Sequence, residues 1–187
     1  MSQRNAVYKG VVVEPRDPKR HGRVRVFVAE FGEEAWARRA TLDAGHERGT
    51  WFVPDAGDEV LVAFENGDRR KPIVIGALWG RSQRPPESKP ERTLVRTKHG
   101  ATVVFDDGTG AVEVSDLNGN VVKLAADGVT VTSASKLQIR ASIVELEAGV
   151  LKVDAAVSEF SGLVKCDSLL TNSVVSSSYT PGAGNIW

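Results

Sequence analysis

The sequence of residues 101–133 reads ATVVFDDGTGAVEVSDLNGNVVKLAADGVTVTS, and its pattern continues to residue 166. Apolar residues occupy every second position of short runs, and a turn built from Gly, Asp, Asn or Ser follows each run. A period of two is typical of a β-strand with one buried face, and it does not fit a helix. The later runs with this period are KLQIRA, SIVELE, VLKVDA, AVSEF and LVKC. The sequence therefore predicts a repeat of short strands over residues 101–166.

A repeat of this kind cannot enclose a hydrophobic core within one chain. Each strand is only about 15 Å long and pairs only with its neighbours. Something outside the repeat must therefore cover its apolar face. Further copies of the same chain are the simplest cover, so the sequence predicts self-association.

Composition argues against several classes of function. The 187 residues carry 24 basic and 24 acidic side chains, and the two halves are similarly balanced, so a general polyanion-binding role is not favoured. A single cysteine, Cys166, excludes an internal disulfide framework. The amino terminus lacks the apolar core of a signal peptide, and no apolar run approaches the roughly 18 residues of a membrane span. We expect synthesis in the cytoplasm without a signal peptide.

Residues 6–79 follow a different pattern, with longer and less regular strand-like segments. A turn at EPRDPKRHG and a hairpin signal at NGD (66–68) separate some of them. EEAWARRA fits either a strand or a helical turn, although Trp36, Arg38 and Ala40 alternate as in a strand. Five strands in a segment this short predict a small closed barrel such as an OB-fold. The segments are 6–14, 22–31, 36–42, 58–65 and 71–79.

The domain organisation follows from these patterns. We expect an OB-fold over residues 1–80, a linker rich in proline and charge over 81–98, and the strand repeat over 99–187. The linker is semi-rigid because it contains Pro85, Pro86 and Pro90. Residues 168–187 have no ionisable side chain apart from Tyr179 and end in an apolar pair. We therefore expect a docking tip at 176–187.

Residues 36–79 resemble the OB-fold of contractile-phage spike proteins, the family of baseplate assembly protein V and the VgrG spikes of type VI secretion systems. The matching elements are GRVRV, Trp36, Gly49, Pro54 with GDEVLVAFENGD (57–68), and PIVIGALW (72–79). HGATVVFDDGTGAVEVSDLNGNVVKLAADGVTV (99–131) resembles the start of the β-helix that follows the OB-fold in these spikes. The resemblance implies an all-β protein in which an OB-fold barrel precedes an intertwined triple-stranded β-helix, assembled as a homotrimer.

In such a trimer, alternation divides the repeat into an inner and an outer face. Glu113, Lys123, Thr130, Gln138 and Arg140 would point outward. The facing switches near Ser142, where Glu145 and Glu147 take the outside. The predicted trimer core consists of Val103, Phe105, Val112, Val114, Val122, Leu124, Val129, Val131, Leu137, Ile139, Val144 and Leu146.

The resemblance implies a mechanical function without catalysis. The protein would be the central spike of a contractile injection system, driven into the target cell envelope by sheath contraction. It would belong to a tail-like particle, either a phage virion or an extracellular or intracellular injection system. Only residues 80–98 could hold a lysozyme between barrel and β-helix, so none is expected.

Differences between this sequence and the spike proteins that it resembles predict its binding partners. The barrel starts almost at Met1, which implies a separate baseplate hub protein at the OB-fold end. No histidine follows His99, so a histidine-bound metal tip is not expected. A separate PAAR-type tip protein would then dock on the carboxy terminus. The predicted docking residues are Tyr179, Pro181, Asn185, Ile186 and Trp187.

Other reactive side chains have simpler interpretations, and we expect no catalytic site, metal site or cofactor. His21, His46 and His99 are scattered over loops. Asp106 and Asp107 lie in a turn sequence without the spacing of a calcium loop. Glu145 and Glu147 share an outer face, where charge keeps a strand soluble. Cys166 lies in an alternating run and is expected to be buried, or on the trimer axis beside its copies.

Two alternatives to the spike remain. OB-folds often bind single-stranded nucleic acid, and RDPKRHGRVR (16–25) with RRK (69–71) supplies positive charge. Interspersed acids and the lack of a paired aromatic platform argue against it. Trp36, Trp51 and Trp79 are expected to pack the barrel or contact the hub. The second alternative is a trimeric adhesin or tail-fibre shaft, with the barrel as its host-binding head.

Overall fold

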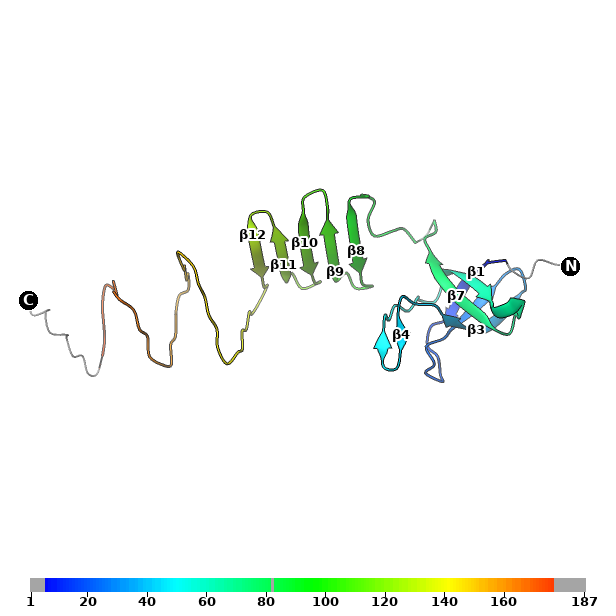
Figure 1. The fold of residues 1–187 in the computed structure, drawn as a ribbon, viewed down its shortest axis with the longest axis horizontal. Coiled ribbons are helices and arrows are strands. Elements are labelled where there is room, and N and C mark those ends of the chain that lie inside the picture. The colour runs from blue at the N-terminus through cyan, green and yellow to red at the C-terminus, as the bar shows by residue number, and fades with distance from the viewer. Residues whose placement is uncertain (1–5, 82, 177–187) are drawn as a thin grey trace, which may run out of the picture. The chain divides into compact units, whose positions relative to one another are not determined.

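A computed structural model describes residues 6–81 and 83–176. The chain forms two units, residues 1–137 and 138–187, and every strand of the described chain lies in the first. The first unit contains a barrel, a small hairpin and a five-stranded sheet (Figure 1). Among the described residues, no helix has the length and hydropathy to cross a membrane.

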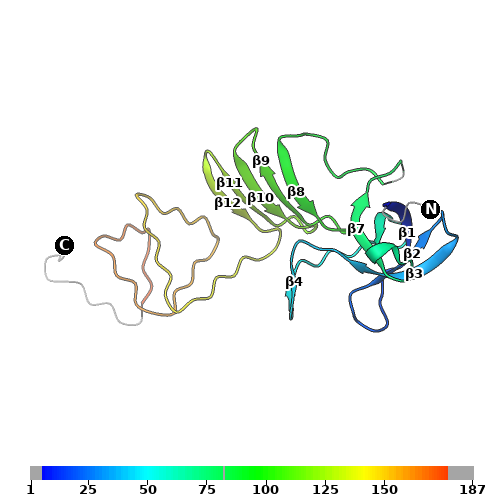
Figure 2. The ribbon, with the colours of Figure 1, turned by 45° about the vertical axis from the view of Figure 1, so that its right-hand side comes forward.

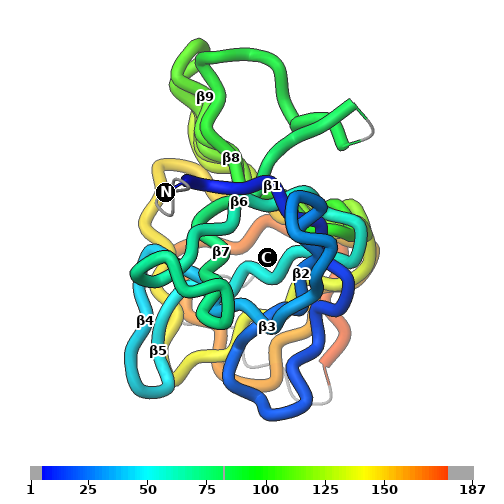
Figure 3. The backbone as a smooth tube through the Cα atoms, turned by 90° about the vertical axis from the view of Figure 1, so that its right-hand side faces the viewer, coloured from blue at the N-terminus to red at the C-terminus, as the bar shows by residue number. Residues whose placement is uncertain are grey.

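The barrel is built from the five strands β1 (Tyr8–Glu14), β2 (Val24–Val28), β3 (Glu33–Arg39), β6 (Glu59–Phe64) and β7 (Pro72–Leu78). They form a closed ring in the order β1-β2-β3-β7-β6, which Figure 3 shows end-on. β3 and β7 run parallel, and the other neighbours are antiparallel. This confirms the predicted OB-like barrel. Because Glu33–Arg39 is a strand, the helical alternative for this segment is wrong.

Every second side chain of a barrel strand points inward, and this alternation explains the composition of the barrel core. Inward positions of the strands carry small or β-branched residues, which pack tightly on a curved sheet. Three aromatic rings, Tyr8, Phe31 and Phe64, pack against this core with centroids 4.8–5.6 Å apart. The buried apolar residues of the described chain are Val12, Val24, Val26, Val28, Ala37, Val60, Val62 and Val74. All of them belong to the barrel.

The connection between β3 and β6 contains an element that the sequence pattern did not predict. Two very short strands, β4 (Ala44–Gly45) and β5 (Arg48–Gly49), form a hairpin there. Gly49 has φ 138°, and a Cβ atom at this position would lie 2.3 Å from the Asp43 carbonyl oxygen. Only glycine allows this close return of the chain. The predicted turn at residues 66–68 is confirmed, with positive φ at Asn66 and Gly67.

The sheet of the first unit is an antiparallel meander. Its strands are β8 (Arg92–Arg96), β9 (Thr102–Asp106), β10 (Ala111–Ser115), β11 (Val121–Ala125) and β12 (Gly128–Thr132), paired in sequence order (Figure 2). The last four are the runs predicted from their alternation, and they are confirmed. β8 falls inside the range 81–98 that the sequence predicts as a linker.

Residues 138–176 contain neither helix nor strand. The runs predicted as strands from Lys136 to Cys166 therefore form no strand in this single chain. A strand requires a neighbour that pairs with its backbone N–H and C=O groups. Within 138–176 the chain supplies no such neighbour, so the alternating runs remain extended and exposed.

Close packing around Gly10 generates a test of the barrel. A Cβ atom on Gly10 would lie 2.9 Å from Val62 Cγ2 and 3.3 Å from the Phe27 carbonyl oxygen. We expect Gly10→Ala to lower the free energy of unfolding by about 1–3 kcal/mol, because the core must shift to admit the methyl group. Urea unfolding followed by circular dichroism measures this change.

Gly76→Ala is the matched control, because Gly76 also lies in a barrel strand but no atom lies within 4 Å of its Cβ position. Its free energy of unfolding should be unchanged or slightly raised. Equal effects of the two substitutions would contradict the packing described for Gly10.

Candidate functional site

The register of the β8–β12 sheet places apolar side chains on one face. Residues opposite each other on neighbouring strands share a face, and alternate residues along a strand do so as well. Phe105 pairs with Val112, Val112 with Leu124, and Leu124 with Val129. Extending this rule gives the apolar face, which consists of Thr93, Val95, Val103, Phe105, Val112, Val114, Val122, Leu124, Val129 and Val131.

This apolar face is open in the single chain. Phe105 is 49% exposed and Val131 is 51% exposed. Monomeric proteins rarely leave so many adjacent apolar side chains in water. Eight residues predicted as trimer core thus share one face, from Val103 to Val131. Their role in a trimer stays a prediction.

The opposite face of the sheet is mixed: it contains Leu94, Val104 and Val121, and it also carries internal ion pairs. Arg92 donates from Nε to Asp106 at 2.7 Å and from Nη1 to Glu87 at 3.1 Å. The bond from Arg92 lowers the pKa of Asp106. Asp106 also accepts a bond from the Thr109 backbone N–H, which confirms the predicted turn. Glu113 lies opposite Lys123, so the outward charges of β10 and β11 are complementary.

The remaining predicted trimer-core residues lie in or next to the extended segment. Leu137, Ile139, Val144 and Leu146 are all exposed in the single chain. Cys166 is also exposed, so the prediction that it is buried is wrong for the single chain. The alternative place for Cys166, on a trimer axis beside its copies, stays a prediction. The predicted docking residues Tyr179, Pro181, Asn185, Ile186 and Trp187 lie outside the described residues.

The histidines and acidic residues show no metal cluster in the described chain. His21, His46 and His99 are exposed in three different connections. Across residues 6–81 and 83–176, no group of three or more His, Cys, Asp or Glu side chains lies close enough to hold a metal ion.

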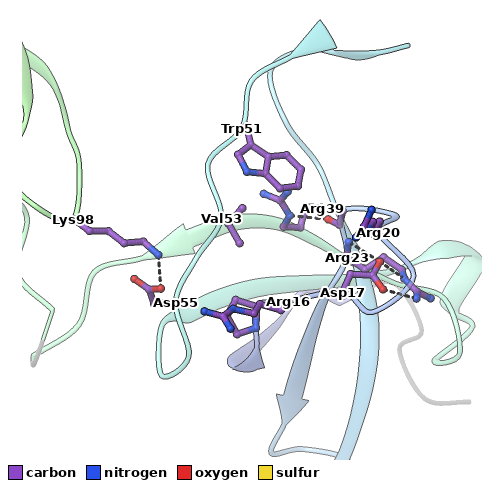
Figure 4. Close-up of a pocket in the computed structure, with 11 residues that line it drawn as sticks. Arg16, Asp17, Arg20, Arg23, Arg39, Trp51, Val53, Asp55 and Lys98 are labelled. Carbon is purple, nitrogen blue, oxygen red and sulfur yellow. Dashed lines mark hydrogen bonds and ion pairs between the residues drawn. The ribbon is translucent and has the colours of Figure 1, made fainter. Parts of the chain in front are cut away.

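A hollow on the barrel surface is the second candidate site, and Figure 4 shows its lining. At its centre the Arg39 guanidinium lies 4.6 Å from the Trp51 ring centroid. Arg39 Nε donates to the Gly22 carbonyl oxygen at 2.8 Å, and Nη1 donates to the Phe52 carbonyl. Partial burial lowers the pKa of Arg39. Arg39, at the end of β3, thus ties the β1–β2 connection to the β5–β6 connection.

Asp17 organises the β1–β2 loop beside this hollow. Its side chain is only 3% exposed and accepts two bonds of 2.9 Å from the Arg23 guanidinium. It also accepts backbone N–H groups of Lys19 and His21. The Arg23 bonds hold the pKa of Asp17 well below its usual range, and the backbone bonds act in the same direction.

Sequence reasoning missed this hollow. Trp51 and Trp79 were expected to pack the barrel or contact a hub, but both are 71% exposed, so packing within the barrel is wrong for them. The available signals were the basic run at 16–25 and the aromatic pair at 51–52. Neither indicated that Arg39, which is distant in sequence, would join them.

The fold and the surface define an OB-type barrel protein with a strand repeat. Residues 8–79 match the family described as the type VI secretion system/phage-baseplate injector OB domain. The barrel of this chain is therefore similar to that domain family.

Relatives support the same assignment. The spike protein of Escherichia phage P2 is 24% identical over 139 residues, which cover 74% of this chain and 63% of that protein. The type VI secretion system spike protein VgrG3 of Vibrio cholerae is 35% identical over 66 residues, 34% of this chain and 6% of its own length. VgrG1a of Pseudomonas aeruginosa is 30% identical over 91 residues, 43% of this chain and 14% of its own length. The resemblance to baseplate spike proteins is confirmed, although the chain spans less than two thirds of each relative.

The Asp17 network generates a pH-dependent prediction. A carboxylate with a lowered folded pKa stabilises the protein above its unfolded pKa of about 3.8, and this contribution is lost as the pH falls through the folded pKa. We expect Asp17→Asn to lower the melting temperature by several degrees at pH 7. The difference from wild type should shrink below about pH 4. Calorimetry across this range measures both effects.

Asp43→Asn is the control, because the Asp43–Arg48 pair is exposed at the surface and such pairs contribute little. A melting-temperature difference for Asp17→Asn that stays constant down to pH 2 would argue against the assigned role.

Proposed function

We propose that this chain is the central spike of a contractile injection system and acts as a homotrimer. The carrying observation is the open apolar face of the β8–β12 sheet. Three copies wound about one axis would turn these faces toward each other and exclude water from them. Each inward residue would then meet its two symmetry copies.

The extended segment supports the same assembly. Residues 138–176 keep the alternating pattern but have no pairing partner in their own chain. In an intertwined triple-stranded β-helix, each run would pair with runs of the two other chains, which also satisfies its backbone groups. Leu137, Ile139, Val144 and Leu146 would continue the inner face.

The function of such a rod is mechanical. Bending it would require many interchain backbone hydrogen bonds to break together, so it would resist the load of sheath contraction. We propose that it pierces the target cell envelope and needs no catalytic residue. The similarity to the phage P2 and type VI spike proteins supports this role.

The assembly would require partners at both ends. A separate baseplate hub protein would bind at the barrel end, and a PAAR-type tip protein would bind at the carboxy terminus. The tip would dock through residues 176–187, which carry Ile186 and Trp187 at their end.

The trimer is tested with Val131→Asp. Wild-type protein should give a mass of about 60 kDa in light scattering, three times the 20.1 kDa chain. Val131→Asp would place three carboxylates near one axis without partners, so the trimer should be lost. Thr130→Asp is the control, because Thr130 belongs to the opposite face, where it pairs with Lys123. A wild-type mass near 20 kDa, or a stable Val131→Asp trimer, would refute the proposal.

The tip is tested by truncation after Ser176. The truncated chain should still form the trimer but should no longer co-purify with the PAAR-type protein expressed beside it. The matched control is truncation of the amino-terminal residues 1–5, which should leave tip binding intact. Retained tip binding without residues 177–187 would place the docking site elsewhere.

A further inference from the structure

Three arginines in the barrel hollow have charges that no carboxylate neutralises. The ionic side chains lining the hollow are Arg16, Arg20, Arg23, Arg39, Lys98, Asp17 and Asp55. Asp17 pairs with Arg23, and Asp55 pairs with Lys98. Arg16, Arg20 and Arg39 have no carboxylate partner in the described part of the chain. The hollow therefore has three positive charges in excess.

Arg39 is held in place before any ligand arrives. Two backbone carbonyls accept its Nε and Nη1 hydrogen bonds, and the Trp51 ring supports the guanidinium plane. These contacts leave Nη2 without a hydrogen-bond acceptor among the described residues. A fixed planar guanidinium loses little entropy when it binds a carboxylate, which makes it a better anion receptor than a mobile lysine.

The hollow also offers apolar surface. Trp51 and Val53 line it beside the arginines, and Phe52, which is 65% exposed, follows Trp51 in the chain. Figure 4 shows the Trp51 ring beside Arg39 at the hollow. Exposed tryptophan next to arginine is the composition of protein-binding hot spots.

We propose that this hollow, the Arg39 groove, binds an acidic segment of a partner protein. Glutamate or aspartate carboxylates of the segment would bind Arg16, Arg20 and Arg39, and an apolar side chain would pack on Trp51. The inference rests on the proposed spike function, because a spike has neighbouring proteins in its particle. One of these neighbours would supply the acidic segment. The groove itself is built by one chain.

A protein segment fits the groove better than a nucleic acid. One face of the Trp51 ring is already used, because Arg39 stacks on it and the ring lies 3.5 Å from the Cβ position of Gly22. Stacking of successive bases needs several aromatic side chains, and Trp51 is the one aromatic residue of the described chain that lines the hollow. Converging arginines suit a short acidic segment instead.

Fluorescence anisotropy with the full chain tests the inference. The probe is a fluorescein-labelled peptide that alternates glutamate with leucine, compared with its glutamine analogue and with a thymidine 12-mer. We expect the acidic peptide to bind more tightly than either. The double substitution Arg16→Glu with Arg20→Glu should weaken its binding by about tenfold or more. Arg39→Lys should weaken it similarly, because the fork geometry is lost while the charge remains.

Lys19→Glu is the matched control, because Lys19 lies in the same loop but does not line the hollow. Its peptide affinity should stay near that of wild type. Equal binding of the glutamine analogue, equal weakening by Lys19→Glu, tighter binding of the oligonucleotide, or no peptide binding would overturn the inference. Light scattering on the same samples separates the two proposals. A trimer that does not bind the peptide would refute only the proposed Arg39 groove. A monomer that binds the peptide would refute only the proposed trimer.

Discussion

No apolar residue of the described chain outside the barrel is fully buried in the single chain. All buried apolar side chains of the described residues lie in the barrel, where strands curve around one core. The β8–β12 sheet is a single layer, so nothing within it covers Val114, Leu124 or Val131. The barrel therefore has a core of its own, whereas the β8–β12 sheet leaves its apolar face open in the single chain.

Local turns explain why the repeat forms strands up to Thr132 and none afterwards. Asp116 accepts hydrogen bonds from the side-chain amide and the backbone N–H of Asn120, and from the same two groups of Asn118. These bonds, above all the one from the Asn120 side chain, lower the pKa of Asp116 to about 2. Asn120 in turn accepts bonds from Ser133 and Ala134. Such turns return the chain beside the preceding strand, so each partner is local. Residues 138–176 have the same apolar period but form no hairpins, so their backbone finds no strand partner within the single chain.

The sequence predicted those features that depend on period alone. Alternation from Val103 to Val131 gave the correct common face, and the five barrel segments gave the correct closed barrel. It did not predict β8, because RTLVR has charges at both ends and follows a proline-rich stretch. It did not predict β4 and β5, since strands of two residues show no period. The Arg39 groove depends on contacts between three distant loops, and no local pattern reports such contacts.

The two edge strands of the β8–β12 sheet differ in charge, and this difference favours further strand pairing at one edge only. Exposed strand edges invite further pairing, and charged side chains discourage it. β8 carries Arg92 and Arg96 at its ends, and Arg92 is fixed by Asp106 and Glu87. β12, with the sequence GVTVT, carries no charge. The edge of β12 is open, and the chain continues from β12 directly into the alternating runs after residue 133. Pairing can therefore extend from β12 onward, while the charges of β8 discourage pairing at the barrel side.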